Sequence, residues 1–166
     1  MAGPRSSNGT PSGSRRIGLL GGTFDPPHHG HLEAARTALG ALELDAVVLV
    51  VANDPWQKTA GGQVVTPAEV RLTMVRAAAD GMDRIEVDDL EIRRGGPSYT
   101  ADTVAKYAQQ GPDDQLFVLV GSDIAPGLHA WARPDEIRRH ATIVVMDRPG
   151  HIGERPPSGW DYVVLK

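Results

Sequence analysis

The sequence contains no cysteine among its 166 residues, and this absence excludes several kinds of site at once. Disulfides, thiolate metal sites and a cysteine nucleophile all need a thiol. The chain also lacks an excess of basic residues, because its formal net charge is -4 and its pI is about 5.8. A domain that holds nucleic acid usually carries a basic stripe and a high pI. We therefore expect no nucleic-acid partner, whereas small charged substrates stay compatible with this composition.

Long apolar runs are lacking as well. The longest, such as Ala46 to Ala52, have the length of a strand and fall far short of the roughly 20 residues that span a bilayer. Met1 to Ser14 are rich in Gly, Ser and Pro and lack the apolar core of a secretory signal. We expect residues 1–15 to form a disordered tail. We also expect a cytoplasmic protein without a membrane contact, which the absence of cysteine suits.

Residues 16–166 are expected to form one domain, because a chain of this length can bury one full core but not two. From Arg16 onward, short apolar runs alternate with amphipathic stretches, the pattern of parallel strands joined by crossover helices. The runs are rich in Val, Ile and Leu without polar alternation, as in strands covered on both faces. The predicted fold class is α/β, a Rossmann-like parallel sheet with helices on both faces. The expected strands are Arg16–Gly21, Asp45–Val51, Ile85–Glu91, Gln115–Val120, Thr142–Asp147 and Tyr162–Lys166.

Helical patterns lie between these runs. One helix is predicted to begin near His31, because apolar residues recur there at helical spacing. Another is predicted from Thr66 to about Ala79, since Thr66–Glu69 combines a capping Thr, a Pro in the first turn and a Glu three residues on. A third helix follows Thr100, and a shorter one starts around Arg133-Pro134. The apolar stripe of the first helix is Leu32, Ala35, Leu39 and Leu42.

The most informative segment is Gly21–His31, with the sequence GGTFDPPHHGH, between the first strand and the first helix. Ligands of open parallel sheets bind outside the carboxyl ends of the strands, and a helix N-terminus offers free N–H groups to an anion. Gly21 and Gly22 would let a phosphate approach the backbone, since neither carries a Cβ. His28 and His31 are three residues apart, so both rings can face one phosphate. Imidazole donors suit phosphoryl-type transfer, in which the protein mainly positions groups and neutralises developing charge.

Two other interpretations of this segment stay open. The glycines and histidines could simply form a tight turn and cap a helix. Two histidines at this spacing could also hold zinc, although no third ligand or general-base Glu stands beside them. We favour the phosphate site, because two glycines, an Asp-Pro turn and a His-x-Gly-His element directly after a strand exceed what a turn requires. His29 receives no role.

The segment resembles the Gly-Gly-x-Phe-Asp-Pro-x-His-x-Gly-His signature of the nicotinate mononucleotide adenylyltransferases, within the wider adenylyltransferase superfamily. The resemblance extends from about Arg16 to Gly150. The His-x-Gly-His element marks only the superfamily, whereas later motifs narrow the substrate to nicotinate mononucleotide. These motifs are Pro55-Trp56-Gln57-Lys58, Ser98-Tyr99-Thr100, Gly121-Ser122-Asp123, Trp131 and Arg148-Pro149-Gly150.

The resemblance implies an enzyme of NAD biosynthesis that converts ATP and nicotinate mononucleotide into deamido-NAD and pyrophosphate. It implies catalytic roles for His28 and His31 and no dedicated metal site, with magnesium entering on the phosphates of ATP. The ATP-binding and phosphate-binding residues implied by the resemblance are Gly21, Gly22, Thr23, Phe24, His28, His31, Gly121, Asp123 and Arg148. The implied mononucleotide-binding residues are Trp56, Lys58, Ser98, Tyr99, Thr100 and Trp131.

The chemistry of these residues fits the implied roles, but each also has a simpler interpretation. Thr100 at a helix N-terminus suits the nicotinate carboxylate, and it could equally cap the helix. Trp131 could stack on a cationic pyridine ring or fill the core. Lys58 could reach phosphate or stay solvated. Asp123 could accept hydrogen bonds from ribose or cap the next helix, and an exposed arginine such as Arg148 is common after a strand.

One family feature is not found in the sequence. Family members end with a Ser-rich segment of the type Ile-Ser-Ser-Thr-x-Ile-Arg, whose charge-assisted hydrogen bonds to ATP are worth roughly 1.5–3 kcal/mol each. Either the sequence shown lacks a C-terminal part, which we favour, or a partner subunit supplies the segment, or the protein is a non-catalytic nucleotide-binding module. Another acceptor, such as nicotinamide mononucleotide or phosphopantetheine, is the alternative within enzymes. A monomer and a homo-oligomer both stay open.

Overall fold

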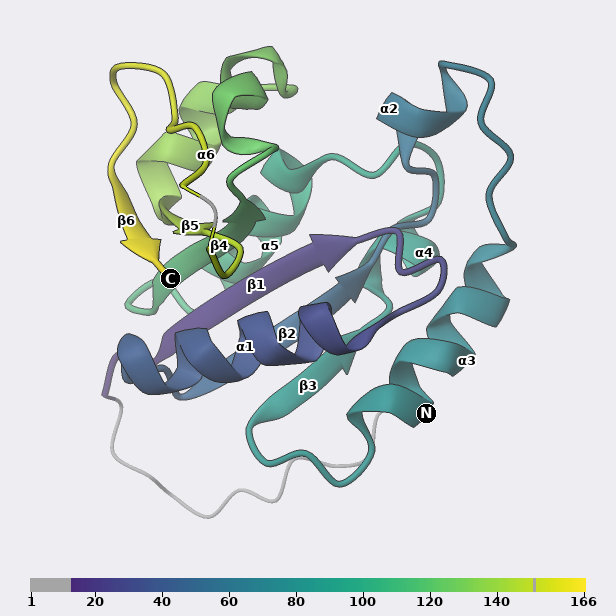
Figure 1. Ribbon diagram of the computed structural model, residues 1–166, viewed down its shortest axis with the longest axis horizontal. Helices are drawn as coiled ribbons and strands as arrows, with labels where there is room; N and C mark the ends of the chain where they lie inside the picture. Colours follow the sequence, from purple (N-terminus) through teal and green to yellow (C-terminus); the bar gives the residue numbers. More distant parts are fainter. Residues whose placement is uncertain (1–12, 151) are drawn as a thin grey trace.

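A computed structural model describes residues 13–150 and 152–166 of the chain. Within them, parallel strands form one sheet in the order β3-β2-β1-β4-β5-β6 (Figure 1). The chain runs outward from β1 to β3 and then returns to the centre with β4, so the strand order reverses between β1 and β4. Such a reversal opens a crevice at the carboxyl ends of the two strands. The strands are β1 (Arg16–Gly22), β2 (Ala46–Val51), β3 (Ile85–Asp88), β4 (Gln115–Gly121), β5 (Ala141–Met146) and β6 (Tyr162–Leu165).

Helices cover both faces of this sheet, as expected from the sequence. One face carries α1 (His29–Ala41) and α3 (Ala68–Ala79) (Figure 1). The other carries α4 (Leu90–Arg94), α5 (Thr100–Gln110), the 3-10 helix η1 (Ala125–Ala130) and α6 (Pro134–His140). A short helix, α2 (Trp56–Thr59), follows β2 and stands apart from both layers (Figure 1).

Each face of the sheet has its own apolar cluster. Val47 and Val48, neighbours in β2, belong to opposite clusters because successive side chains of a strand point to opposite faces. Val47 packs with Leu39 of α1 and Leu72 of α3, whereas Val48 packs with Val104 of α5. Every residue of β2 is buried, so the run had no reason to alternate with polar residues.

The end of the third strand was predicted wrongly. The expected strand Ile85–Glu91 stops at Asp88, and the chain turns at once into α4. The Asp88 carboxylate accepts a hydrogen bond from the Leu90 N–H at 2.9 Å, which starts the turn. The apolar residues after Asp88 therefore reach the core from a helix and not from a longer strand. The other predicted strands agree with the observed ones to within one residue at each end.

The predicted cap of α3 was also wrong. Pro67, not Thr66, occupies the N-cap, and no side chain caps this helix. Thr66 instead donates its backbone N–H to the Asp25 carboxylate at 2.9 Å, and its carbonyl accepts from Arg71. One tertiary contact, with Asp25, and one local contact, with Arg71, thus replace the predicted capping box. The first helix begins at His29, two residues earlier than expected.

Most of the predicted N-terminal tail, residues 1–12, lies outside the described residues. Arg15, its last residue, donates its N–H to the Asp114 carboxylate at 2.9 Å and accepts from the Gln115 N–H at 2.8 Å. No helix in the described part of the chain is long and apolar enough to cross a membrane.

Candidate active site

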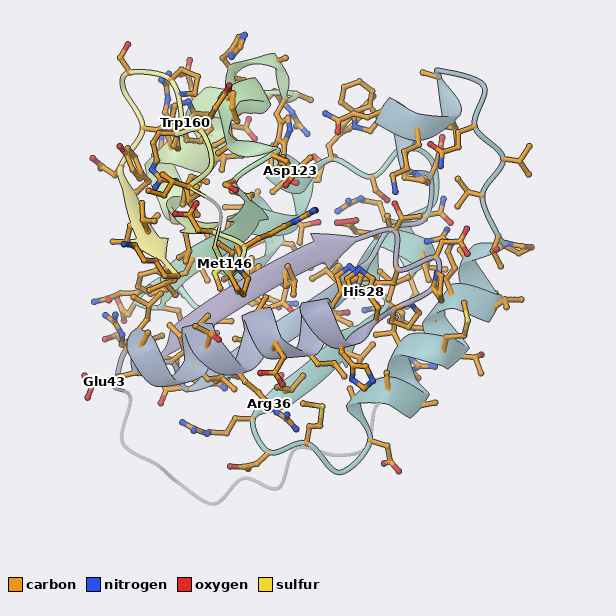
Figure 2. All side chains as sticks on the ribbon, in the orientation of Figure 1. His28, Arg36, Glu43, Asp123, Met146 and Trp160 are labelled. Atoms are coloured by element: carbon orange, nitrogen blue, oxygen red, sulfur yellow. The ribbon has the colours of Figure 1, made fainter. Side chains whose placement is uncertain are left out.

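The two predicted catalytic histidines meet at the start of α1. His28 is the N-cap and His31 lies one turn on, and their rings stack with centroids 3.8 Å apart (His28 is labelled in Figure 2). The His28 Nδ1 accepts the Gly30 N–H, and the His31 Nδ1 accepts the His28 N–H, each at 3.1 Å. With both Nδ1 atoms accepting, each neutral ring carries its proton on Nε2. The pair therefore presents Nε2–H donors at a helix N-terminus.

The electrostatic surroundings keep His31 neutral. Burial, with smaller contributions from positive charge at His28 and Lys58, lowers the pKa of His31 to about 4. The edge of the buried Phe24 ring contacts the His31 ring, with centroids 4.8 Å apart. At neutral pH His31 is thus an uncharged hydrogen-bond donor, and Lys58 of α2 supplies positive charge close to it.

Each glycine of this loop leaves space for a different group. A Cβ on Gly30 would lie 3.0 Å from Cε1 and Nδ1 of the His28 ring, so the glycine lets that ring fold over the helix start. A Cβ on Gly22 would lie 3.1 Å from the Phe24 ring, so this glycine makes room for Phe24. Gly21 has no protein atom near its Cβ position and is exposed, which leaves that backbone open to a ligand.

The predicted mononucleotide-binding residues converge in a second part of the site. The segment before α5 and the end of η1 join α2 around a cavity of about 70 Å³. The rings of Trp56 and Tyr99 contact each other with centroids 5.6 Å apart. Lys58 does not line this cavity but lies in the same helix as Trp56. The cavity is lined by Trp56, Gln57, Ser98, Tyr99, Thr100, Trp131 and Ala132.

The structure bears on the alternatives for Thr100 and Trp131. Thr100 is the first residue of α5, and Tyr99 before it makes no side-chain cap, so no side chain at the N-cap of α5 shields the free N–H groups there from the cavity. Trp131 packs against the apolar cluster of its face and also lines the cavity, so its place in the core does not remove its ring from the cavity; its stacking on a pyridine ring stays a prediction.

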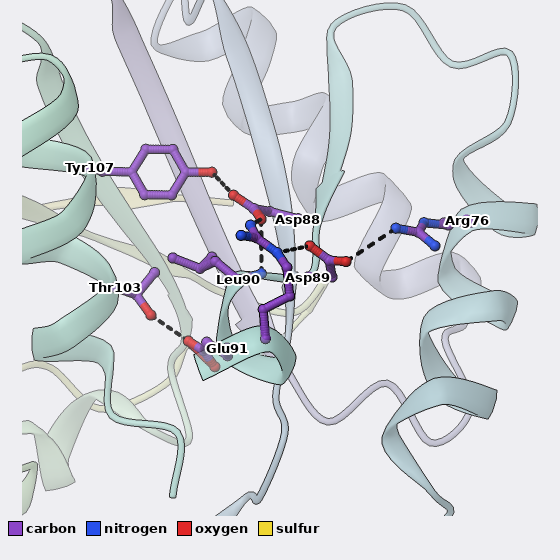
Figure 3. Close-up of polar contacts among 8 residues, drawn as sticks. Arg76, Asp88, Asp89, Leu90, Glu91, Thr103 and Tyr107 are labelled. Atoms are coloured by element: carbon purple, nitrogen blue, oxygen red, sulfur yellow. Dashed lines mark hydrogen bonds and ion pairs between the residues drawn. The ribbon is translucent and has the colours of Figure 1, made fainter. Parts of the chain in front are cut away.

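Buried polar contacts support the wall of this cavity from behind. The carboxylate of Glu91 in α4 accepts a hydrogen bond from the Thr103 hydroxyl of α5 at 2.5 Å (Figure 3). Burial raises the pKa of Glu91, whereas the hydrogen bond from Thr103 and the charge of Arg94 oppose the rise. Nearby, Tyr107 of α5 donates to the Asp88 carboxylate at 2.6 Å (Figure 3). These contacts tie α5, whose first residue faces the cavity, to the end of β3.

The remaining predicted phosphate-binding residues lie beyond β4 and β5. Asp123 follows the end of β4 (Figure 2), and its carboxylate lies 3.9 Å from the Arg148 guanidinium, with both side chains exposed. A Cβ on Gly121 would lie 2.4 Å from the Asp123 carboxylate, so a larger residue there would turn the exposed Asp123 side chain away from its observed position. Asp123 does not cap η1, which has Ile124 at its N-cap and no side-chain cap. Asp123 and Arg148 are therefore available to a ligand.

Two further features bear on where a ligand binds. Among the described residues, no group of three or more His, Asp or Glu side chains could hold a metal ion. A larger hollow of about 360 Å³ lies between the end of α1 and the start of β3. It is at the amino ends of the strands, whereas the predicted motifs lie at the carboxyl ends. It is lined by Arg36, Leu39, Gly40, Gly81, Met82, Asp83, Arg84 and Ile85, none of which belongs to the motifs above.

Sequence reasoning missed two residues that join the parts of the site. Arg71 of α3 is buried and donates to backbone carbonyls of both loops that form the site. Asn53 donates its N–H to the Ser98 hydroxyl at 2.8 Å and its side-chain amide to the Gly96 carbonyl at 2.9 Å. A signal for Arg71 was present, because it lies one turn before Val75 and two turns before Ala79, on the apolar face of its helix.

Comparison with known proteins agrees with this architecture. A family model described as cytidylyltransferase-like matches residues 19–165. A probable nicotinate-nucleotide adenylyltransferase of Saccharopolyspora erythraea is 42% identical over 147 residues, which cover 87% of this chain and 68% of that protein. Another of Shouchella clausii is 43% identical over 144 residues, which cover 87% of this chain and 74% of that protein.

Solved structures share the fold. The nicotinic acid mononucleotide adenylyltransferase of Plasmodium falciparum, complexed with NaAD, superimposes with a TM-score of 0.75 at 16% identity, over 91% of this chain and 74% of that chain. The same enzyme complexed with APC gives a TM-score of 0.71 at 15% identity, with the same coverage.

The fold and the site thus define a nucleotidyltransferase of the cytidylyltransferase-like class. Within that class, the chain belongs to the family of nicotinate-nucleotide adenylyltransferases.

Proposed function

We propose that this chain transfers the AMP part of ATP to nicotinate mononucleotide, giving deamido-NAD and pyrophosphate in the biosynthesis of NAD. The observation that carries the proposal is the stacked pair His28 and His31, whose Nε2–H groups lie at a helix N-terminus. Lys58 connects this pair to the second part of the site, because its charge acts on His31 while Trp56, two residues before it in α2, lines the cavity. The relatives named above support the same reaction.

The chemistry requires positioning rather than a protein nucleophile. An oxygen of the acceptor's 5′-phosphate forms a bond to the α-phosphorus of ATP, and the bond from that phosphorus to the bridging oxygen breaks, so pyrophosphate leaves. Negative charge develops on the oxygens around the α-phosphorus and on the leaving group. The Nε2–H groups of His28 and His31 donate to these oxygens, and the N–H groups at the start of α1 add to the same field.

The cavity suits a pyridine ring that carries a carboxylate. Trp56, Tyr99 and Trp131 provide flat aromatic faces, which attract a cationic pyridinium. Thr100 lies at the first position of α5, where a hydroxyl and free backbone N–H groups favour an anion. A carboxylate gains more from these donors than an amide does, since hydrogen bonds to charged groups are stronger. We therefore propose nicotinate mononucleotide over nicotinamide mononucleotide as the acceptor.

We further propose that magnesium enters with ATP. The described residues offer no cluster of three ligands, which fits an ion that keeps most of its waters and binds mainly to substrate phosphates. Asp123 would then hold ribose hydroxyls and Arg148 phosphate, both on the exposed ends of β4 and β5. We place the reaction in the cytoplasm, which the lack of cysteine suits.

A direct test measures pyrophosphate release from ATP with nicotinate mononucleotide and, separately, with nicotinamide mononucleotide. We expect the nicotinate compound to have the higher kcat/KM, and His31→Ala to lower kcat by roughly 100-fold or more. His31→Asn has an oxygen that can still accept the His28 N–H, so it separates helix capping from catalysis. His140→Ala, on the exposed end of α6, is the matched control and should keep full activity.

Full turnover by the folded His31→Ala protein would contradict the assigned mechanism, and preference for nicotinamide mononucleotide would contradict the assigned acceptor. Calorimetry with ATP and with each mononucleotide completes the test. Tight binding of both substrates without any product would identify a non-catalytic nucleotide-binding module instead.

A further inference from the structure

Arg71 is the most deeply buried charged side chain in the described part of the chain, with 1% of its surface exposed. It projects from α3 toward the carboxyl ends of β1 and β2. Its guanidinium donates four hydrogen bonds, all to backbone carbonyl oxygens. The acceptors are Thr66 at 2.7 Å from Nε, Thr23 at 2.9 Å and Ala52 at 2.7 Å from Nη1, and Asn53 at 3.0 Å from Nη2.

These carbonyls belong to the two halves of the site. Thr23 lies in the loop after β1 and directly precedes Phe24, whose ring packs on His31. Ala52 and Asn53 lie after β2, at the start of the segment that leads into α2. One planar side chain thus connects the loop of the catalytic histidines to the segment that carries the acceptor cavity.

A second set of contacts continues from Asn53 into the cavity wall. The Asn53 N–H donates to the Ser98 hydroxyl at 2.8 Å, and the Ser98 N–H donates to the Asp54 carbonyl at 3.0 Å. Ser98 lines the acceptor cavity next to Tyr99. The carbonyl of Asn53 is held by Arg71 while its N–H is held by the cavity wall. A shift of Arg71 is therefore transmitted to both sides of the site.

The charge of Arg71 has no close carboxylate partner. Its hydrogen bonds within the described residues go to neutral carbonyls, and the only carboxylate that acts on it electrostatically is that of Asp25. Burial lowers the pKa of Arg71, and the charge of Asp25 opposes this effect. A buried guanidinium without an ion-pair partner is costly to keep, so its retention in this structure calls for a use.

We propose that Arg71 is a positioning residue of the transfer reaction, which holds the histidine loop and the acceptor cavity at a fixed separation and so aligns the two substrates. The inference rests on the proposed function, because alignment matters only if two substrates react across these loops. Each loop keeps its own ligand-binding residues when Arg71 is changed. The loss therefore falls on the geometry between the bound substrates and less on the binding of either one.

Lysine is the informative substitution. Arg71→Lys keeps the positive charge but offers a compact ammonium with three donors in place of a planar fork with five. It cannot reach four carbonyls on three segments at once. Arg76→Lys on the same helix is the matched control, because Arg76 is largely exposed and forms an ion pair with Asp89 at 3.6 Å, which a lysine can also form (Figure 3).

The test compares the full chain with its Arg71→Lys and Arg76→Lys variants, well below the unfolding temperature of each. For Arg71→Lys we expect kcat to fall by about 10- to 100-fold, the effect of an ångström-scale misplacement. We expect the dissociation constants of MgATP and nicotinate mononucleotide, measured separately by calorimetry, to change by less than about threefold. Arg76→Lys should match the wild type in all three quantities. A purely structural role would lower only the melting temperature, and a folded Arg71→Lys protein with wild-type kcat would overturn the proposal.

A second readout works without turnover. If the wild type transfers no adenylyl group, the proposed function fails by itself, and the role of Arg71 is then decided by NMR titration of the imidazole protons. Release of the Thr23 carbonyl should let the Phe24 loop move and expose the His31 ring to water. We expect the pKa of His31, about 4 in the wild type, to rise in Arg71→Lys and to stay unchanged in Arg76→Lys. An unchanged pKa in Arg71→Lys would overturn the coupling between Arg71 and the histidine loop.

Discussion

His28 and His31, the two predicted catalytic residues, also hold their own helix start in place. The His28 ring accepts the Gly30 N–H, and the His31 ring accepts the His28 N–H, so both Nδ1 atoms are used inside the protein. These bonds orient the rings and fix the tautomer that carries a proton on Nε2. The His-x-Gly-His spacing is explained by this arrangement, since a side chain at Gly30 would press on the His28 ring at 3.0 Å.

A pH prediction follows for His31. Because burial lowers its pKa from 6.5 to about 4, His31 remains a neutral donor well below the pH at which an exposed histidine is charged. The folded-state pKa is depressed, so the stability due to neutral His31 is fully present above 6.5 and is lost as the pH falls toward about 4. Urea unfolding should therefore show a steeper loss of stability for the wild type than for His31→Asn between about pH 6.5 and pH 4.

NMR titration of the imidazole protons checks the same assignment without unfolding. A His31 midpoint near 6.5, or equal slopes for the two proteins, would contradict the inferred burial of the ring. With the pKa of His31 at about 4, an acid limb of kcat/KM between about pH 5 and pH 7 belongs to another group of the enzyme or of its substrates.

At the scale of elements, connecting segments decide how the site is assembled. The segment between β5 and β6 is held by Asp147, which is buried at the end of β5. Its two carboxylate oxygens accept from the Arg155 guanidinium at 2.8 and 2.9 Å, and one of them accepts from the Gly153 N–H at 3.3 Å. The bond to Arg155 lowers the pKa of Asp147. These contacts of Asp147 with Gly153 and Arg155, here called the Asp147 clasp, hold the segment that follows β5. They place Gly153 of this segment beside Ser122, which follows β4.

Removal of this clasp should loosen the segment. Asp147→Asn replaces the bidentate, charge-assisted pair with weaker neutral hydrogen bonds. We expect faster cleavage after the exposed Glu154 by a glutamate-specific protease, and a higher KM for ATP, with the KM for the mononucleotide little changed. Asp135→Asn is the control, because Asp135 pairs with Arg138 on the exposed surface of α6, where such pairs contribute little. Equal cleavage rates in the two variants would show that the Asp147 clasp does not hold the segment.

At the scale of the whole molecule, a central strand must accept helices on both faces. A Cβ on Gly18 of β1 would lie 2.9 Å from Leu44, 3.1 Å from Val47 and 3.2 Å from Leu119. Glycine at this point lets the apolar layer close against the sheet. A larger residue at this position of β1 therefore has no free space to occupy.

Gly18→Val should destabilise the whole fold. The added methyl groups overpack one apolar cluster, and such changes cost about 1–3 kcal/mol. The urea midpoint should fall while the slope of the transition stays the same. Gly40→Ala in α1 is the control, because nothing lies within 4 Å of its Cβ position, and alanine in a helix is favoured over glycine by roughly 0.5–1 kcal/mol. A Gly18→Val protein as stable as the wild type would show that the apolar layer repacks freely.

Much of the fold could be predicted from the sequence, because its apolar runs report local burial. The buried strand β2 and the apolar stripe of α1 were predicted from these runs. The motif Gly21–His31 was recognised from its residue types and spacing. The end of β3 could not be predicted, since apolar residues of a short helix and of a strand give the same pattern. The predicted Thr66 cap was wrong for another reason, because the carboxylate of Asp25, 41 residues away in the sequence, accepts the Thr66 N–H, while the nearby Arg71 donates to the Thr66 carbonyl.

By itself, the sequence determined the α/β class, the strands of the sheet and the loop that carries both histidines, because these depend on the polarity and spacing of residues close together in the chain. Only the tertiary structure decided that the segments after β1, β2, β4 and β5 gather at the carboxyl ends of the strands and that Arg71 joins the first two of them. The physical reason is that a buried guanidinium is satisfied by backbone carbonyls, which every residue carries. No side-chain pattern in the sequence marks which carbonyls those are.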